Sequence, residues 1–410
     1  MLSRILVLLL IFSNSMLIAG VKPGIDVLVE RNFEPVRGKK VALLSNFAGR
    51  DSKGKLTAEI LASSDELELD AILAPEHGFF TTVPAGLAVN DSKIFGVPVK
   101  SLYGEKKEPN TRYISSLDAV IIDMQDIGVR SYTYLSTMYN TMYVAALSGT
   151  KVIVLDRPNP LGGLIVDGNV LDTAYRSFVG IIPVPYIHGC TFGELAYMIN
   201  EENWLPSSYG RQLKCDLTII AMENWERWMH WEDTGMQWYP TSPHIPTTNS
   251  IRGIAMLGVF GELGIVSVGV GTTLPFQYIG SNAFKYDELF EAIKHCEIQG
   301  VRIEPTMFRP FYGMYSGKDV AGIYLSFEPD NSFTPYTSGI RLMFEIKKHH
   351  PQLFERDSLS SKAINMFNKV TGGYKVFNDF FGGADLKTLL LTANEGLLDF
   401  LTFREKYLLY

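Results

Sequence analysis

Short apolar runs alternate with longer amphipathic stretches through the first part of the chain, and this alternation constrains the fold more than any other feature. Four runs rich in Val, Ile and Leu have the length of buried strands, and they cover residues 40–46, 69–73, 119–124 and 152–155. Helix candidates at 57–63 and 133–147 lie between members of this set. Parallel strands covered by helices on both faces have this pattern. The sequence therefore predicts an α/β fold with a doubly wound, mainly parallel sheet.

The rest of the chain is less regular. Thr191, followed three residues later by a Glu and then by apolar residues, predicts the start of a helix with a capping box. Strand-like and helix-like segments continue beyond residue 271. Because 410 residues are many for a single core, we expect two domains with a boundary near Ser250. They are residues 20–250 and a smaller C-terminal domain, 251–410.

The first nineteen residues have the three-part layout of a secretory signal peptide. A short cationic start precedes an unbroken apolar run, Ile5–Phe12, and small residues follow up to Gly20. Eight strictly apolar residues are too few to span a bilayer, and no later segment is long enough. We therefore expect cleavage near Ala19, export to the periplasm or the medium, and a mature chain without a membrane span.

Composition and missing motifs exclude several classes of function. The net charge of −7 and the lack of a basic stripe argue against a nucleic-acid partner. Cys190, Cys215 and Cys296 are odd in number and far apart, which predicts three buried thiols, with one disulfide as the alternative. The chain lacks the GxGxxG, GxxxxGK[ST], GxSxG and HExxH motifs. We therefore expect no dinucleotide cofactor, no serine esterase mechanism and no bound metal.

Polar or ionisable residues follow each of the four predicted strands. They are Ser45-Asn46, Glu76-His77, Asp123-Met124-Gln125-Asp126 and Asp156-Arg157-Pro158-Asn159. In open α/β sheets, ligands bind at the carboxyl ends of the strands. The coincidence of four polar strand ends predicts a functional site at this edge.

Glu76 is the first candidate for catalysis. It lies in the turn Pro75-Glu76-His77-Gly78, and the aromatic residues Phe79 and Phe80 follow. Apolar surroundings favour the protonated form of a carboxyl group, which a general acid needs. The alternative is a structural Glu that caps a helix or pairs with an arginine.

Asp123 and Asp126 are candidates for the second carboxylate of a glycosidase pair. One of them could instead cap a helix that begins near Ser131. Arg130 offers a planar fork for a substrate carboxylate, or else forms a salt bridge to Asp126.

Two further features have alternative interpretations. His188, in a turn after a Pro-rich strand, either contacts a ligand or is structural, and with His77 and an aspartate it could form a metal site. Residues 225–246 contain four tryptophans and either line a saccharide cleft or form a hydrophobic seam between lobes.

Several long motifs occur in order along the chain, and together they carry a resemblance to a known family. The motifs are Pro75-Glu76-His77-Gly78, Ser101-Leu102-Tyr103-Gly104, Asp123-x-Gln125-Asp126-x-Gly128-x-Arg130-x-Tyr132-Thr133-Tyr134, Asp156-Arg157-Pro158-Asn159-Pro160-Leu161-Gly162-Gly163, Tyr175-Arg176-Ser177-Phe178-Val179-Gly180, His188-Gly189-x-Thr191-x-Gly193-Glu194, Glu232-Asp233-Thr234-Gly235, Ser242-Pro243-x-Ile245-Pro246-Thr247 and Tyr407-Leu408-Leu409-Tyr410. From about Gly24 to its end, the chain resembles the exported exo-β-N-acetylmuramidase family.

The resemblance implies a Rossmann-like N-terminal domain, a smaller α+β C-terminal domain and a cleft between them. It implies removal of β-1,4-linked N-acetylmuramic acid from the non-reducing ends of peptidoglycan fragments during cell-wall recycling. The family's candidate catalytic Glu corresponds to Glu76. The strand-end positions of the other motifs are the natural cleft residues, and with His77 they are Asp123, Asp126, Gln125, Arg130, Asn159 and His188.

One segment departs from the family pattern. Many members have a stretch like Ser-Glu-Gly-Arg-Gly-Thr-Thr-Arg-Pro-Phe-Glu, whereas this chain has residues 267–277 with the sequence SVGVGTTLPFQ. Two acidic and two basic side chains are replaced, which implies a different sugar or aglycone rather than a different reaction. The alternatives are a non-catalytic saccharide-binding protein and a metal-dependent hydrolase that uses Glu76, His77 and an aspartate.

Overall fold

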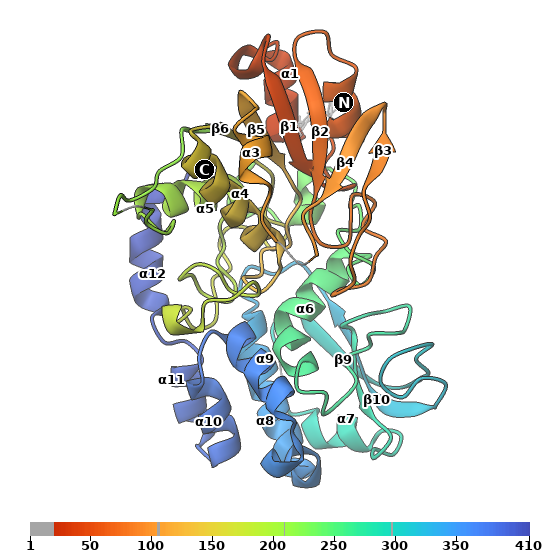
Figure 1. The fold of residues 1–410 in the computed structure, drawn as a ribbon. Helices are drawn as coiled ribbons and strands as arrows, with labels where there is room; N and C mark the ends of the chain where they lie inside the picture. The colour runs from red at the N-terminus through yellow and green to blue at the C-terminus, as the bar shows by residue number, and fades with distance from the viewer. Residues whose placement is uncertain (1–19, 105–106, 209, 297) are drawn as a thin grey trace, which may run out of the picture.

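The N-terminal half of the protein forms a seven-stranded, mainly parallel sheet with the strand order β3-β4-β2-β1-β5-β6-β7 (Figure 1). The computed structural model describes residues 20–410 except 105–106, 209 and 297, so the predicted signal peptide lies outside the described residues. Only the edge strand β3 runs antiparallel to its neighbour. The strands are β1 Lys40–Ser45, β2 Glu68–Ala74, β3 Ser92–Ile94, β4 Val97–Ser101, β5 Ala119–Asp123, β6 Lys151–Leu155 and β7 Leu217–Ile220.

Alternate residues of the central strands belong to two separate cores, one on each face of the sheet. In β1, Ala42 and Leu44 pack into the core that includes helices α4 (Tyr134–Ser148) and α5 (Phe192–Glu201). Val41 and Leu43 pack into the other core, with α1 (Gly24–Glu30) and α2 (Thr57–Ala62). Successive side chains of a strand point to opposite faces, so a strand that is apolar throughout requires cover on both. The predicted doubly wound α/β fold is confirmed.

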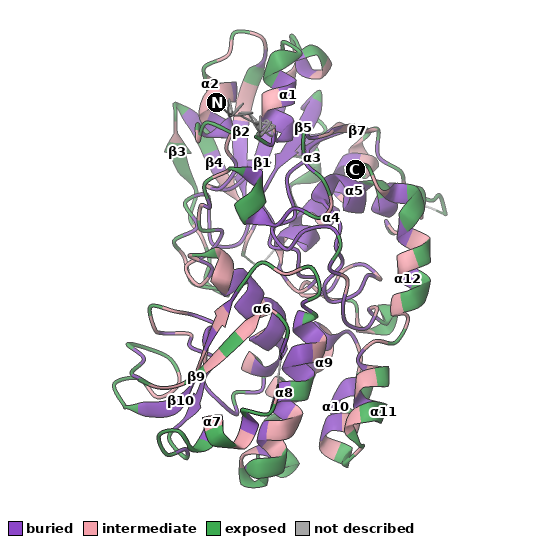
Figure 2. Cartoon of the chain, turned by 180° about the vertical axis from the view of Figure 1, so that it is seen from behind, coloured by how far each residue is buried: buried purple, intermediate pink, exposed green. Residues whose placement is uncertain are grey.

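The C-terminal domain is smaller and contains a three-stranded antiparallel sheet with the order β8-β10-β9 (Figure 1). The strands are β8 Tyr278–Ser281, β9 Val301–Phe308 and β10 Val320–Phe327. Among the helices of this half are α6 Thr248–Gly261, α7 Glu288–Ile293, α8 Pro335–His349, α9 Ser361–Thr371, α10 Lys375–Gly382, α11 Leu386–Thr392 and α12 Leu397–Arg404. The boundary expected near Ser250 falls in the first turn of α6. Figure 2 shows that buried residues continue from the large sheet into α6 and α8.

The helix that Thr191 was expected to start is α5, and its capping box is confirmed. The Thr191 hydroxyl accepts a hydrogen bond from the Glu194 N–H at 3.2 Å, and the Glu194 carboxylate accepts one from the Thr191 N–H at 2.9 Å. Both side chains are buried, so the box satisfies donors that have no access to water.

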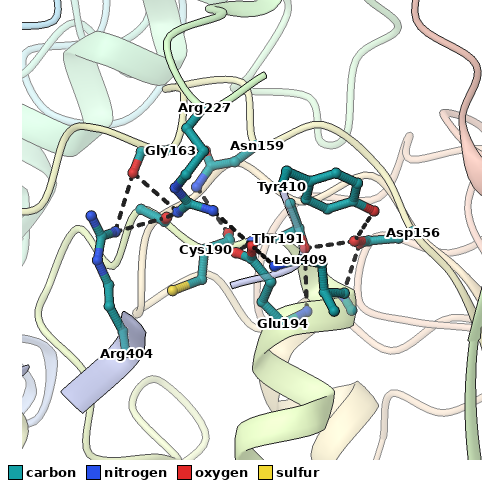
Figure 3. A network of polar contacts seen from close by, with 12 residues as sticks. Asp156, Asn159, Gly163, Cys190, Thr191, Glu194, Arg227, Arg404, Leu409 and Tyr410 are labelled. Atoms are coloured by element: carbon teal, nitrogen blue, oxygen red, sulfur yellow. Dashed lines mark hydrogen bonds and ion pairs between the residues drawn. The ribbon is translucent and has the colours of Figure 1, made fainter. Parts of the chain in front are cut away.

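The end of the chain returns from the C-terminal domain to the large sheet (Figure 3). The Tyr410 hydroxyl donates to the Asp156 carboxylate at 2.8 Å, directly after β6. The Leu409 N–H donates to Glu194 at 3.0 Å, and Arg227 forms an ion pair with the same carboxylate at 2.7 Å. The C-terminal domain is therefore attached to the N-terminal domain at both ends.

The three cysteines are unpaired, as expected, but they are not all buried. Cys190 and Cys215 are buried, whereas Cys296 is half-buried. In the described part of the chain, no helix is long and apolar enough to cross a membrane.

Tyr410→Phe should lower the free energy of unfolding by about 1–3 kcal/mol. The hydroxyl donates to Asp156 and accepts from the Met222 N–H at 2.8 Å, so its loss removes a hydrogen-bond partner from two groups. Urea unfolding followed by circular dichroism measures the change. Tyr197→Phe, at an exposed position on α5, is the matched control and should stay within about 0.5 kcal/mol of the unaltered protein. Equal midpoints for both variants would contradict a stabilising role of the C-terminal contact.

Candidate active site

A cavity of about 680 Å³ lies between the two domains, and Glu76 is one of its lining residues. The loops after β2 and β5 contribute the wall from the large sheet, including Glu76, His77, Tyr132 and Thr133. The opposite wall comes from α6 and from the segment 266–276. We refer to this cavity as the cleft.

Glu76 occupies a tight turn directly after β2. His77 and Gly78 have φ values of 71° and 73°, so the chain turns sharply as it leaves the strand. The Glu76 side chain is 5% exposed. One of its carboxylate oxygens accepts a hydrogen bond from the Gly86 N–H at 2.9 Å, and the other accepts one from the Thr133 hydroxyl at 2.6 Å. Both oxygens are thus fixed in place at the wall of the cleft.

His77 and Tyr103 line the cleft beside Glu76. The Nδ1 atom of His77 lies 2.8 Å from the Val83 carbonyl, which only accepts, so Nδ1 carries a proton. Burial lowers the pKa of His77, which favours the neutral ring. Burial and the nearby Glu76 carboxylate raise the pKa of Tyr103, so its hydroxyl remains a donor.

Asp123 does not line the cleft. It is fully buried and forms an ion pair with Arg157 through both carboxylate oxygens, one of them at 2.9 Å from Nη2. The same Nη2 atom donates to the Arg50 carbonyl at 2.6 Å. Asp123 therefore links β5 to the loops that follow β1 and β6.

Asp126 also lies outside the cleft, beside a void of about 10 Å³. One of its oxygens accepts from the Gly128 N–H at 2.8 Å, and the other is buried without a partner among the described residues. Burial raises the pKa of Asp126 to about 7. Burial thus favours the protonated form of this carboxyl group more than it would be favoured in water.

Arg130 is buried inside the protein and does not reach the cleft. Its guanidinium donates to the carbonyls of Asn169 and Val184 at 2.7 Å and of Val370 at 3.1 Å. Among the described residues it forms no ion pair, so the salt bridge to Asp126 considered from the sequence is absent. Burial lowers the pKa of Arg130 to about 10. Its position joins the N-terminal domain to α9.

The remaining predicted residues serve the packing of loops. Gln125 Nε2 donates to the Asp126 and Pro158 carbonyls, and Asn159 Nδ2 donates to the Cys190 carbonyl at 3.0 Å. His188 Nδ1 accepts from the Cys190 N–H, and burial lowers the pKa of His188 to about 3.

Of the eight predicted site residues, the cleft brings together Glu76 and His77 alone. The other polar residues that line the cleft are not among the eight predicted site residues. They include Tyr103, Lys107, Ser131, Thr133, Ser177, Ser242, His244, Glu262 and Lys369. The motifs quoted above contain four of these residues, Tyr103, Thr133, Ser177 and Ser242, and membership of a motif could have identified them as site residues. Nothing in the sequence pointed to Lys107, Glu262 or Lys369.

The fold and the cleft define a two-domain α/β protein with a buried carboxylate at the domain interface, and comparison with known proteins gives its family. Residues 41–249 match the N-terminal domain described as "Exo-beta-N-acetylmuramidase NamZ, N-terminal", and residues 254–410 match the corresponding C-terminal domain. The chain belongs to this family, and it is a glycosidase.

Individual relatives agree with this assignment. The chain is 33% identical over 393 residues to the peptidoglycan beta-N-acetylmuramidase NamZ of Bacillus subtilis (strain 168), covering 95% of this chain and 91% of that protein. A DUF1343 family protein from Bacteroides fragilis has a similar structure, with a TM-score of 0.87, 35% identity and coverage of 95% and 99% of the two chains. A second DUF1343 family protein from the same organism has a TM-score of 0.73 and 29% identity over 96% and 99%.

Asp126→Asn should make stability less sensitive to pH. Because burial raises the folded-state pKa of Asp126 to about 7, its contribution to stability is fully present below about pH 4 and is lost as the pH rises through about 7. An Asn cannot ionise. Between pH 5 and pH 8, the variant should therefore lose roughly 2–3 kcal/mol less unfolding free energy than the unaltered protein.

Urea unfolding at several pH values measures this difference. Asp399→Asn, at an exposed position on α12, is the control and should keep the original pH profile. Parallel profiles for Asp126→Asn and the unaltered protein would contradict the raised pKa.

Proposed function

We propose that this enzyme releases β-1,4-linked N-acetylmuramic acid from the non-reducing ends of peptidoglycan fragments, with Glu76 as the general acid. The observation that carries the proposal is the position of Glu76, at the wall of the interdomain cleft and held through both oxygens. The similar Bacillus subtilis protein is described as acting on peptidoglycan. The apolar segment at 5–12 supports export, which would bring the enzyme to this substrate.

In the proposed reaction, Glu76 donates its proton to the glycosidic oxygen as the bond to the anomeric carbon breaks. The Thr133 hydroxyl can accept as well as donate, so it can hold Glu76 in either protonation state. Tyr103 lies beside the same carboxyl group and supplies a further donor to the sugar or to Glu76.

The second step needs a group that attacks the anomeric carbon. Neither Asp123 nor Asp126 lines the cleft, so we infer that neither activates water. Two routes fit the cleft. The 2-acetamido oxygen of the substrate can attack the anomeric carbon and form a cyclic oxazolinium ion, which water then opens. Alternatively Glu262, an exposed carboxylate on the opposite wall, can activate a water molecule that attacks the same carbon.

The lactyl carboxylate of muramic acid requires a cation, and Lys107 meets this requirement better than Arg130. Its Nζ atom lies 4.1 Å from the ring centroid of Phe178 and 4.9 Å from that of Tyr103, at the edge of the cleft. No ion pair of Lys107 occurs among the described residues. A lysine held by aromatic rings and without an acidic partner is suited to bind an anionic group of the substrate.

The altered segment 267–277 contributes to the opposite wall. Val268 and Val270, which stand where the family pattern has Glu and Arg, both line the cleft. This apolar wall supports the proposal that the sugar or aglycone in this part of the cleft is less polar than in relatives that keep the charges.

Glu76→Gln should lower kcat on a chromogenic β-N-acetylmuramide by about 10²- to 10⁴-fold, because the amide cannot donate the proton to the leaving group. The unfolding midpoint should change little. Glu262→Gln is the matched variant on the opposite wall. If it keeps full activity, the acetamido group makes the attack; if it loses activity to a comparable extent, Glu262 activates the water.

Near-normal turnover of Glu76→Gln would refute the role of Glu76 as the general acid. Loss of activity in EDTA would instead favour the metal-dependent alternative.

Lys107→Met should raise KM for the β-N-acetylmuramide by about 10- to 100-fold, because a charge-assisted hydrogen bond contributes about 1.5–3 kcal/mol. The neutral N-acetylglucosamine analogue should be hydrolysed, where it is a substrate, with an unchanged KM. Lys100→Met is the control, since the Lys100 Nζ atom also lies over an aromatic ring, 3.4 Å from the centroid of Tyr113, but outside the cleft. An unchanged KM of Lys107→Met for the muramide would contradict the assignment.

A further inference from the structure

The loop between β9 and β10, residues 309–319, reaches the cleft and carries two exposed aromatic side chains. Phe311 is 75% exposed and Tyr312 is 51% exposed. Met314, two residues further along the loop, is one of the residues that line the cleft. Tyr312 itself lies just outside the enclosed part of the cleft, where its ring is open to solvent. We refer to residues 309–319 as the β9–β10 loop.

Tyr312 connects this loop to the N-terminal domain through His244, which lines the cleft. The Tyr312 hydroxyl lies 2.6 Å from Nε2 of His244, and the two rings are 28° from parallel with centroids 6.1 Å apart. Burial lowers the pKa of His244, and the nearby His77 ring acts in the same direction. Because His77 directly follows Glu76, a continuous series of side chains leads from the general acid to Tyr312.

Backbone contacts to the altered segment 267–277 hold the β9–β10 loop in place. The Phe311 N–H donates to the Gly271 carbonyl at 2.7 Å, and the Ser316 hydroxyl donates to the Phe311 carbonyl at 2.9 Å. Gly271 has a φ of 95°, and a side chain there would lie 2.1 Å from the Tyr312 carbonyl oxygen. The Tyr312 ring is therefore presented on an ordered loop, which reduces the entropy lost when a ligand binds.

The tip of the β9–β10 loop is uncharged. Residues 310–317 contain no ionisable acid or base other than tyrosine, and Arg309 and Asp319 at the base form an ion pair with each other at 2.7 Å. A tyrosine ring combines a flat apolar face with a polar edge, so it can pack on the apolar face of a sugar ring beside the sugar hydroxyls. The tip thus favours a neutral sugar over a charged peptide.

The position of Tyr312 relative to Glu76 indicates which sugar it meets. Glu76 protonates the oxygen that leaves with the second sugar, so the leaving sugar lies on the side of His77 and His244. Lys107, the proposed partner of the lactyl carboxylate, instead packs on Tyr103 and Phe178. The open position of Tyr312 also suits the leaving sugar, since the rest of the fragment must continue from it into solvent.

We propose that Tyr312 forms the subsite for the leaving sugar, an uncharged N-acetyl sugar that stacks on its exposed ring. This inference rests on the proposed function, because it assumes that muramic acid occupies the other side of Glu76. In this role Tyr312 determines specificity: it binds the part of the substrate beyond the cleaved bond and takes no part in bond breaking.

Tyr312→Leu tests the subsite with two substrates that differ only in the leaving group. One is the β-1,4-linked disaccharide of N-acetylmuramic acid and N-acetylglucosamine, and the other is methyl β-N-acetylmuramide. Loss of the ring should raise KM for the disaccharide about tenfold, which corresponds to about 1.4 kcal/mol. The methyl group is too small to reach Tyr312, so KM for the methyl glycoside should stay within about twofold.

Two control variants separate the ring from its surroundings. Phe311→Leu changes the adjacent and more exposed ring, which forms no aromatic pair among the described residues, and KM should stay within about twofold on both substrates. Tyr312→Phe keeps the ring and loses only the hydroxyl at His244, so KM for the disaccharide should rise less than about threefold. An unchanged KM of Tyr312→Leu for the disaccharide, or an equal rise for both substrates, would overturn the proposal. A loss in Tyr312→Phe as large as that in Tyr312→Leu would also overturn it.

Binding without turnover distinguishes a failure of this subsite from a failure of the proposed function. The Glu76→Gln protein is titrated calorimetrically with the same disaccharide, with and without Tyr312→Leu, and the second substitution should weaken binding about tenfold. If the unaltered protein hydrolyses neither substrate, the proposed function fails, and this comparison alone decides the role of Tyr312. Equal dissociation constants, or no binding with Tyr312 in place, would overturn the subsite.

Discussion

A single buried carboxylate, that of Asp156, holds together the parts of the chain on which the rest of the structure depends. Directly after β6 it accepts hydrogen bonds from the Thr191 hydroxyl at 2.6 Å, the Gly193 N–H at 2.8 Å and the Tyr410 hydroxyl at 2.8 Å (Figure 3). Burial raises the pKa of Asp156 to about 6, and these donors act in the opposite direction. The sheet, the start of α5 and the end of the chain therefore meet at one residue. Because the C-terminal domain begins at α6 and ends here, its two attachments limit how the cleft can open.

The fold could be predicted from the sequence because its main signals are local. The strands at β1, β2, β5 and β6 were found within one or two residues, since each is a short apolar run that needs cover on both faces. The capping box of Thr191 was found because it involves residues three apart. Strands β4 and β7 were not identified: their burial alternates or is partial, and their pattern is correspondingly weaker.

The site could be predicted only in part. The polar strand ends indicate the correct edge of the sheet, but they do not show which side chains lack internal partners and can therefore contact a substrate. Asp123 and Arg157 form an ion pair inside the protein, and the Arg130 guanidinium donates its hydrogen bonds to three backbone carbonyls. A sequence does not distinguish such internal partners from a substrate. The opposite wall, with Glu262, lies more than a hundred residues away along the chain, so its approach to Glu76 depends on the packing of two domains.

The buried polar network also explains why the cleft lies where it does. The strand order of the sheet reverses between β1 and β5. At the carboxyl ends of these two strands, the Asp123–Arg157 pair and the Arg50 carbonyl occupy much of the space, and only a small pocket remains. The loop after β2, one strand further out, instead turns sharply at His77 and brings Glu76 to the domain interface. Phe47 and Phe80, with ring centroids 6.0 Å apart, connect these two loops. A change in the loop after β1 can thus reach the Glu76 turn through aromatic packing, without any shared cavity.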